Sequence, residues 1–267
     1  MRLFQTSGLD ALLQRPEQES LLRRFLRAPL TVTAQLLYQY LTHQPRSSAQ
    51  PTDSALIRVV CISDTHSTQP HLPDGDILVH EGDRTQSGTK AELEAQIEWL
   101  HAQPHRHKVT GSDIDWKSLI YLQNTYTTLD CGAHGRRITI FGSPYTPKHG
   151  NWAFQYLPAD TKFWDDVPIP EETDILITHG PPRTHLDLGR LGCSLLLDRL
   201  WFLRQKPLLH VFGHIHGGYG MEVLRWGGLL KLLFFGGRRV LLPGEFIWWG
   251  SQKTVMINAA AAICVDI

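Results

Sequence analysis

Four short apolar segments of the sequence each run directly into a polar turn that carries aspartate or histidine. Apolar runs of this length, bounded by glycine-containing turns, predict buried strands. In α/β proteins ligands bind at the carboxyl edge of such strands, so the four turns are expected to lie at one site. The segments read IRVVCI-SDTH, ILVH-EGD, DILIT-HGPP and LLHVF-GHIH, at residues 57–66, 77–83, 174–182 and 208–216.

The rest of the chain after residue 56 completes an α/β pattern. Apolar residues spaced i, i+4, i+7 predict a helix at Lys90–Gln103, and a second helix is expected at Ser194–Gln205. Alternating strands and helices followed by clustered strands predict an α/β sandwich with mixed sheets. Further strands are expected at Arg137–Phe141, Arg239–Leu242, Phe246–Trp249 and Thr254–Ile257.

The first 55 residues differ in composition from the remainder and are expected to be a helical extension with a linker, ahead of one domain at residues 56–267. Residues 20–41 predict a helix that breaks near Pro29. Two interpretations of this helix remain open: it packs on the domain, or it makes a peripheral contact with a membrane or a partner. Packing is the simpler one, because only three arginines accompany its apolar residues and three attract an anionic membrane weakly.

Composition excludes several classes of protein. The chain has 26 basic and 26 acidic residues, so its net charge gives no support for binding nucleic acid. It shows no apolar run long enough to span a bilayer and no secretory signal. Its four cysteines are scattered and form no C-x-x-C pair, which fits a reducing compartment. A cytoplasmic location is therefore expected, whereas the oligomeric state is not specified.

One further region is unusually apolar. Residues 224–249 read LRWGGLLKLLFFGGRRVLLPGEFIWW. The segment is either part of the core or an exposed patch that binds a lipid-like ligand or a partner, and core is favoured because apolar strands are usually buried.

The chemistry of the four turns fits a centre with two metal ions. Asp64 and His66 alternate by two, as do His214 and His216, so on an extended backbone each pair points one way. The two oxygens of Asp83 suit a bridging ligand. Mixed imidazole and carboxylate ligands favour zinc, manganese, iron or nickel over calcium. Two such ions about 3.5–4 Å apart clamp a phosphate and activate a water molecule.

The order of these motifs resembles that of the calcineurin-like metallophosphoesterases. Longer stretches resemble the metallophosphoesterase-domain branch, which is related to class III cyclic-nucleotide phosphodiesterases. The resemblance covers roughly residues 57–260, and it implies a four-layer α/β/β/α sandwich with two mixed sheets that hydrolyses phosphodiesters or phosphomonoesters. The stretches are VVCISDTHS, HEGDRTQSGT, FGSPYTPKHGNWAFQY, ILITHGPPRTHLD and HVFGHIHGGYG.

The resemblance also implies a ligand set for two divalent ions, with a small anionic, phosphate-containing substrate. One site would use Asp64, His66 and His216. The other would use His179 and His214, and Asp83 would bridge the two sites. Other histidines are open: His80 either orients a ligand or simply packs, and His149 and His185 are candidates for lining the pocket.

One family motif is broken in this chain. Where the family has G-N-H-D or G-N-H-E, this sequence has Ser112 and Asp113 in place of the Asn and the His. A serine hydroxyl is a poorer ligand than an amide oxygen, although Asp113 offers a carboxylate instead. Asp113 needs a raised pKa to act as an acid, because an ionised carboxylate repels phosphate. Asp113 and His216 are the candidate catalytic residues.

Three functions follow from these observations. A metal-dependent phosphoric ester hydrolase is favoured, with activity reduced or altered by the change at Ser112 and Asp113. A degenerate family member would bind a phosphate-like ligand or a partner without turnover. A repurposed metal site would carry out other chemistry on an organic substrate, for which the only support is the apolar segment at residues 224–249.

Overall fold

The computed structural model describes residues 56–110, 118–131, 136–189, 191–226 and 252–267, together with positions 26 and 29. Apart from those two positions, the extension at residues 1–55 and its helix at residues 20–41 lie outside the described residues. The expected strands at Arg239–Leu242 and Phe246–Trp249 lie outside them too. The division into extension and domain stays a prediction.

The first sheet carries two of the four motif turns. β1 and β2 run parallel to each other and to β3 and β4, whereas β13 pairs antiparallel with β1. Both turns therefore emerge at the same edge. The strand order is β13-β1-β2-β3-β4, with β1 Arg58–Ile62, β2 Ile77–His80, β3 His107–Thr110, β4 Ile120–Tyr121 and β13 Ile263–Asp266.

The second sheet carries the other two motif turns. β6, β9, β10 and β12 run parallel in its centre, and the antiparallel strands β5 and β11 form its edges. A separate pair consists of β7 (Thr146–Pro147) and β8 (Gln155–Tyr156). The strand order is β11-β12-β10-β9-β6-β5, with β5 Thr125–Cys131, β6 Arg136–Ser143, β9 Ile175–Thr178, β10 Leu209–Phe212, β11 Gly220–Arg225 and β12 Lys253–Asn258.

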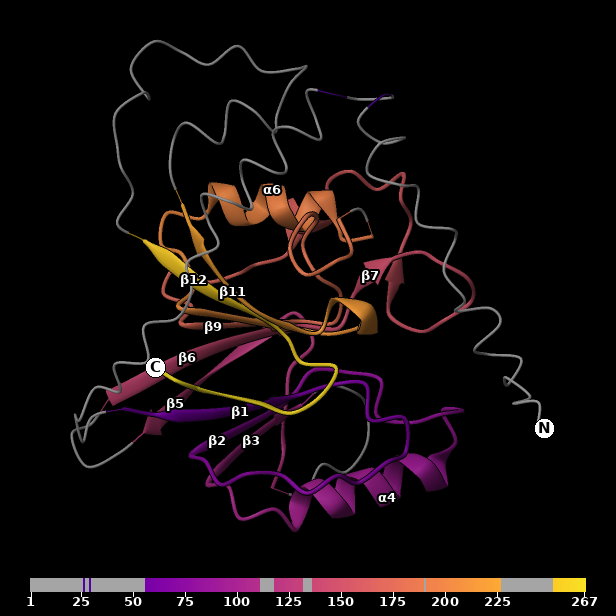
Figure 1. Ribbon diagram of the computed structural model, residues 1–267, viewed down its shortest axis with the longest axis vertical. Coiled ribbons are helices and arrows are strands. Elements are labelled where there is room, and N and C mark those ends of the chain that lie inside the picture. Colours follow the sequence, from indigo (N-terminus) through magenta and orange to yellow (C-terminus); the bar gives the residue numbers. More distant parts are fainter. Residues whose placement is uncertain are drawn as a thin grey trace.

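The two sheets lie face to face (Figure 1), and they share one hydrophobic cluster. Side chains alternate along each strand, so Val59 and Cys61 of β1 enter this cluster together with Val211 of β10. Their neighbours Val60 and Ile62 point the other way, into a second cluster. Burial on both faces explains why these strands are continuous apolar runs rather than alternating ones.

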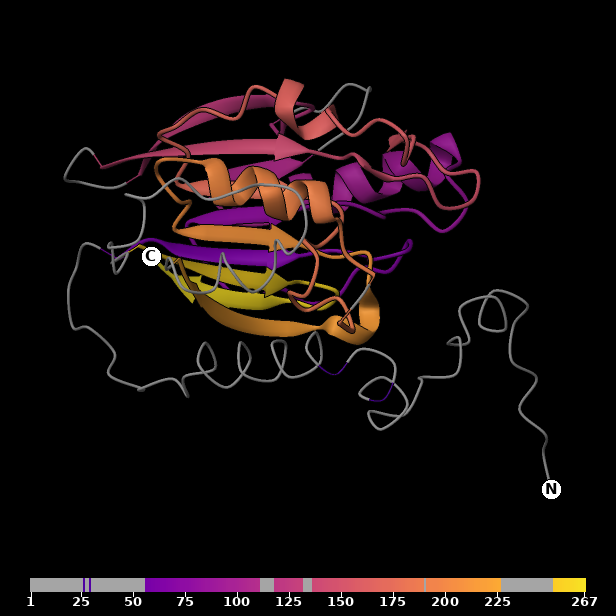
Figure 2. The same cartoon turned by 90° about the horizontal axis from the view of Figure 1, so that it is seen from above.

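Helices cover the outer faces of the sheets. α4 (Lys90–His101) contributes Ile97 and Leu100 to the cluster on the first sheet. α6 (Ser194–Phe202) contributes Leu196 and Leu200 to the cluster on the second sheet and lies over that sheet in Figure 2. The short helix α5 (Phe163–Asp166) adds Trp164 to the same cluster on the second sheet. No helix among the described residues has the length and apolarity needed to cross a bilayer.

The predicted α/β sandwich with mixed sheets is confirmed. The second helix is shorter than expected, because the chain turns into an extended conformation at Leu203. Leu224 and Trp226 are buried, which agrees with the core interpretation for the start of the apolar segment, while residues 227–251 lie outside the described part of the chain. Several strands were not predicted, among them the polar edge strand β5.

Candidate metal centre

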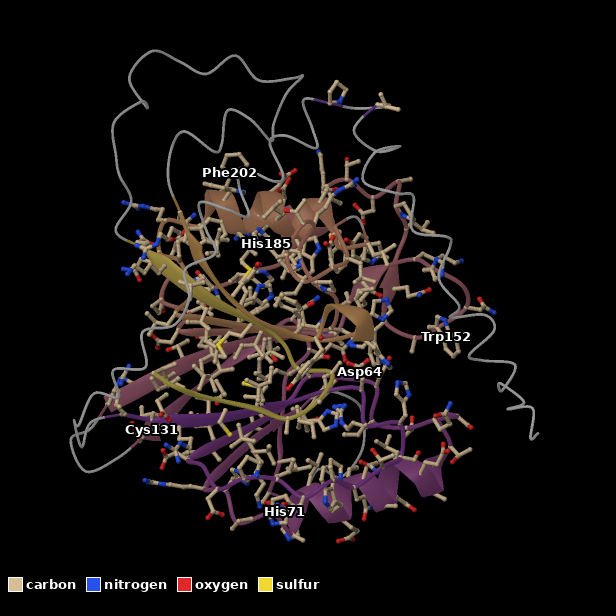
Figure 3. The ribbon with its side chains drawn as sticks, viewed as in Figure 1. Asp64, His71, Cys131, Trp152, His185 and Phe202 are labelled. Carbon is tan, nitrogen blue, oxygen red and sulfur yellow. The ribbon has the colours of Figure 1, made fainter. Side chains whose placement is uncertain are left out.

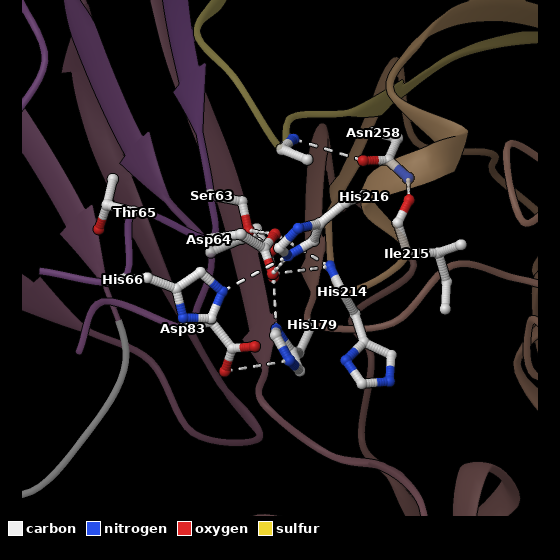
Figure 4. A network of polar contacts seen from close by, with 12 residues as sticks. Ser63, Asp64, Thr65, His66, Asp83, His179, His214, Ile215, His216 and Asn258 are labelled. Carbon is white, nitrogen blue, oxygen red and sulfur yellow. Dashed lines mark hydrogen bonds and ion pairs between the residues drawn. The ribbon is translucent and has the colours of Figure 1, made fainter. Parts of the chain in front are cut away.

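The six predicted ligand residues converge at the carboxyl edge of the sheets (Figure 4). They form two groups of three, and within each group the potential ligand atoms lie within 4.8 Å of one another. The first group consists of Asp64, His66 and His216, and the second of Asp83, His179 and His214. Figure 3 places Asp64 between the sheets, on the side where the strands end.

The first group is built around a buried carboxylate. The side chain of Asp64 is fully buried, and its Oδ1 lies 3.1 Å from Nε2 of His216. The same His216 nitrogen lies 3.4 Å from Nε2 of His66. The backbone N–H of His214 donates to both oxygens of Asp64, at 3.2 and 3.0 Å. Asp64 is thus oriented by the turn that follows β10, although it belongs to the turn that follows β1.

The second group is built around a mostly buried imidazole. Nε2 of His179 lies 3.4 Å from Oδ1 of Asp83, and only 12% of the His179 side chain is exposed, against 43% for Asp83. The ring of His214 stands 4.8 Å from the ring of His179, at an interplanar angle of 55°. In the first group the carboxylate of Asp64 is more buried than the imidazole of His216, whereas in the second group the imidazole of His179 is more buried than the carboxylate of Asp83.

The backbone is in a costly conformation at four of the six residues. Asp64, His66, Asp83 and His214 have φ values of 52°, 43°, 47° and 64°, in the left-handed region. Residues with a Cβ seldom adopt this region, and each instance costs on the order of 1 kcal/mol or more. Such conformations gather where a site requires particular side-chain directions. Their concentration here supports a functional role for the cluster.

Two glycines make the close packing possible. A Cβ at Gly82 would collide with the imidazole of His179, which lies against the end of β2. A Cβ at Gly213 would collide with Ser63, Asp64 and Glu81 at once. The G-D and G-H-x-H motifs therefore need their glycines for space as well as for the turn.

Sequence reasoning did not assign a role to Glu81 or Ser63. Glu81 is completely buried at its side chain, and its Oε2 lies 3.2 Å from Nδ1 of His179. The hydroxyl of Ser63 makes short hydrogen-bonding contacts with Oε1 of Glu81 and Oδ2 of Asp64. Glu81 was visible as an acidic residue between His80 and the G-D motif, but only the fold shows that it faces His179.

Asn258 at the end of β12 was also missed. Its Nδ2 donates to the backbone oxygens of Leu186 and Ile215, at 3.1 and 2.9 Å. It thereby fixes the turn between His214 and His216 against the loop after β9, and Figure 4 shows its contact with Ile215. An asparagine after an ordinary strand gives no sequence signal for this function.

Paired charges shift the pKa values of the histidines. The hydrogen bond to Asp64 raises the pKa of His216. Burial opposes protonation of His179, but the carboxylates of Glu81 and Asp83 outweigh it and raise its pKa well above the ordinary value. Burial and the nearby charge of His179 lower the pKa of His214 to about 4. The two carboxylates thus favour the doubly protonated form of His179 in the absence of metal, and a metal ion that binds through Nε2 must displace a proton there.

The carboxylates show the matching shifts. Burial favours the neutral form of Asp64, but the hydrogen bond from His216 and the charge of His179 outweigh it and lower its pKa. Burial likewise opposes ionisation of Asp83, but the hydrogen bond and charge of His179 outweigh it and lower the pKa of Asp83. Burial dominates at Glu81 and raises its pKa to about 7. Ionised Asp64 and Asp83 with imidazole nitrogens form a donor set that suits divalent first-row metal ions.

Other candidates from the sequence have different positions. His80 is buried, and its Nε2 lies 3.0 Å from the hydroxyl of Thr65, the residue between Asp64 and His66. His149 is exposed. The expectation that His185 lines the pocket is wrong, because it is buried on the α6 side of the second sheet, 2.6 Å from Glu222 (Figure 3). Ser112 and Asp113 lie outside the described residues.

The sequence is similar to several curated proteins, although no protein-family model matches it. Metallophosphoesterase domain-containing protein 1 of Homo sapiens is 35% identical, over 64% of this chain and 64% of its own length. The UPF0046 protein K07C11.7 of Caenorhabditis elegans is 34% identical, over 65% of this chain and 69% of its own length.

A third relative has a different name. Probable rhamnogalacturonate lyase C of Emericella nidulans is 47% identical over 97% of this chain, but the match spans only 29% of that protein. The chain thus covers less than two thirds of this relative and of the human one.

Proposed function

This chain belongs to the metallophosphoesterase-domain family, and from that premise we propose that it hydrolyses phosphodiesters or phosphomonoesters with two divalent metal ions. The observation that carries the proposal is the pair of facing ligand groups, each with potential ligand atoms within 4.8 Å of one another. Costly backbone conformations at four of these residues support the same function.

The residues fit two adjacent metal sites. Asp64, His66 and His216 would hold one ion, and His179 and His214 the other, with Asp83 shared between them. The donor set suits manganese, iron, zinc or nickel. When bound, such ions neutralise charge on the phosphoryl oxygens and make water a better nucleophile at neutral pH.

The chain itself supplies orientation and access. The backbone N–H of His214 fixes the Asp64 carboxylate, and Glu81 contacts Nδ1 of His179, the ring nitrogen that does not face Asp83. Asp83 and His216 have side chains that are 43% and 50% exposed, so an entering phosphate would meet them first. Protonation of the leaving group requires an acid, and Asp113 is the candidate that the sequence provides.

The substrate that fits this site is a small anion with a phosphate group. The chain has no net charge at pH 7 when histidine is neutral, so attraction would come from the bound ions rather than from a basic surface. The same balance speaks against nucleic acid as a partner. Peripheral membrane contact through residues 20–41 remains a separate proposal.

A non-hydrolytic function is the second candidate, and the change at Ser112 and Asp113 favours it. Losing a group that stabilises the transition state commonly costs on the order of 10²-fold or more in rate. The lyase name of the Emericella protein adds no third candidate, because this chain corresponds to 29% of that protein.

The two candidates separate in a combined metal and activity measurement. We expect elemental analysis to find two metal ions per chain, and the protein to hydrolyse an activated aryl phosphodiester with added Mn²⁺ but not after chelation. Folded protein that is inactive with manganese, iron, zinc and nickel would exclude the hydrolase. In that case, activity gained by the double substitution Ser112→Asn, Asp113→His would show that the sequence change had converted a competent scaffold into a binding protein.

A further inference from the structure

Glu81 occupies a special place in the candidate centre, because it contacts one residue of the second ligand group directly and one of the first through a single serine. We propose that Glu81 is a positioning residue that fixes the imidazole of His179 for the second metal ion and ties the two ligand groups together. This inference rests on the proposed two-metal function and extends it to a residue outside the ligand set.

The two nitrogens of His179 have distinct partners. Nδ1 faces Oε2 of Glu81 at 3.2 Å, whereas Nε2 faces Oδ1 of Asp83 at 3.4 Å, inside the ligand group. A metal ion at this group would therefore meet Nε2, while Nδ1 keeps a proton that it donates to Glu81. A carboxylate in this position selects the tautomer, fixes the ring plane and makes the ligating nitrogen more basic.

The other oxygen of Glu81 reaches the first group. Oε1 contacts the hydroxyl of Ser63, which also contacts Oδ2 of Asp64. The remaining oxygen of Asp64 lies 3.1 Å from His216. A continuous chain of polar contacts therefore runs from His179 through Glu81 and Ser63 to Asp64, and the position of each group depends on the other.

The surroundings leave Glu81 little freedom. Its side chain has no solvent-exposed area, and the space above Gly213 is filled by Glu81, Ser63 and Asp64 together. The absence of a side chain at Gly82 leaves room for the ring of His179 beside Glu81, since a Cβ there would collide with that ring. A buried carboxylate without partners is expensive, so a buried glutamate with both oxygens engaged indicates a specific pairing.

The chain offers a matched comparison in the pair His185 and Glu222. Nδ1 of His185 lies 2.6 Å from Oε1 of Glu222, and the histidine is only 2% exposed. Both pairs join a buried histidine to a glutamate, but neither His185 nor Glu222 belongs to a candidate metal group. Glu222→Gln therefore controls for the general effect of altering a buried histidine–glutamate pair.

The test measures metal affinity rather than activity alone. The full chain is freed of metal and titrated with Zn²⁺ against a chromophoric chelator, as wild type, Glu81→Ala, Glu81→Gln and Glu222→Gln. We expect Glu81→Ala to weaken the second of two sites by about 10- to 100-fold and the first site much less. Glu81→Gln should lose less, because its side-chain oxygen still accepts from Nδ1. The affinities of Glu222→Gln should match those of wild type.

A second measurement reports the tautomer. In ¹⁵N spectra of the zinc-loaded wild type, the ring of His179 should show a protonated Nδ1 and a metal-bound Nε2. This pattern should persist in Glu81→Gln and broaden or change in Glu81→Ala. A purely structural role of Glu81 would alter stability in both variants and leave this pattern unchanged.

The outcomes separate the two proposals. Glu81 has no positioning role if Glu81→Ala binds two ions as tightly as wild type and keeps the tautomer. Where the alanine variant does not fold, the same conclusion follows if Glu81→Gln binds the second ion as tightly as wild type. A wild type that binds two ions with this dependence on Glu81, but hydrolyses no phosphoester, would overturn the hydrolase and leave the inference standing. A wild type that binds fewer than two ions would overturn both.

Discussion

The two sheets contribute opposite chemistry to the centre. Among the described residues, the turns after β1 and β2 of the first sheet supply the carboxylates, namely Asp64, Asp83 and the supporting Glu81, with a single imidazole from His66. The turns after β9 and β10 of the second sheet supply only imidazoles, from His179, His214 and His216. Each ligand group takes members from both sheets, so neither sheet can form a group alone.

This division links the centre to the packing of the sheets. The histidine–carboxylate contacts cross from one sheet to the other: Asp64 with His216 at 3.1 Å, and His179 with Glu81 and Asp83 at 3.2 and 3.4 Å. The hydrophobic cluster shared by the sheets brings these partners together. In the metal-free protein the histidine–carboxylate pairs hold the two edges, and metal ions would take over this function by displacing protons.

Removing the exposed carboxylate of the first sheet is expected to have the largest effect. Asp83→Asn keeps the size of the side chain, and asparagine tolerates the left-handed φ of 47° at this position. It removes the charge that pairs with His179 and the oxygen proposed to bridge the metals. We expect kcat/KM for an activated aryl phosphodiester with Mn²⁺ to fall by about 10²–10³-fold.

The control for this substitution lies on the second sheet. Asp130 on β5 is 82% exposed at its side chain, and its Oδ1 lies 3.9 Å from Nε of Arg137. Asp130→Asn also removes one negative charge but should leave the rate unchanged. If Asp83→Asn and Asp130→Asn lost equal amounts of activity, then net charge would determine activity, and not the carboxylate of Asp83 between the two sheets.

The histidines of the second sheet differ in pKa, so the dependence of stability on pH can distinguish His210 from the others. His210 on β10 is completely buried, and burial lowers its pKa to about 3. In the unfolded chain it takes up a proton near pH 6.5, whereas in the folded chain it does not. Its contribution to stability is therefore complete above pH 6.5 and is lost as the pH falls, by about 1.4 kcal/mol per pH unit.

His210→Gln removes this titration while keeping a donor for the hydroxyl of Thr178, which lies 2.9 Å from His210 Nε2. Urea unfolding of the metal-free protein between pH 6.5 and 5 should show wild type losing about 2 kcal/mol more than the variant. Parallel pH dependences for the two proteins would mean that His210 is protonated in the folded state.

The sequence predicted the candidate metal ligands, but not the residues that position them. Asp64, His66, Asp83, His179, His214 and His216 could be found because each follows an apolar strand, and strand ends of parallel sheets converge. Glu81, Ser63 and Asn258 could not, because the contacts that reveal their roles join residues at least 18 positions apart in the sequence and depend on how the sheets pack. β5 was not predicted for a similar reason. It is a polar edge strand that pairs antiparallel with β6 through its backbone, and its sequence TYTTLDC contains no apolar run.

The smallest predicted effect concerns the outer face of the first sheet, where a substitution should change stability without changing the metal centre at the carboxyl edge of that sheet. Thr89 caps α4: its hydroxyl accepts from the N–H of Glu92 at 3.3 Å, and Glu92 accepts from the N–H of Thr89 at 3.1 Å. Thr89→Ala should lower the free energy of unfolding by about 1 kcal/mol, and Thr89→Ser, which keeps the cap, should not. Because α4 covers the face of the first sheet opposite the shared cluster, metal affinity should be the same in both variants. A loss of affinity in Thr89→Ala alone would show that the centre depends on this helix as well as on the packing of the two sheets.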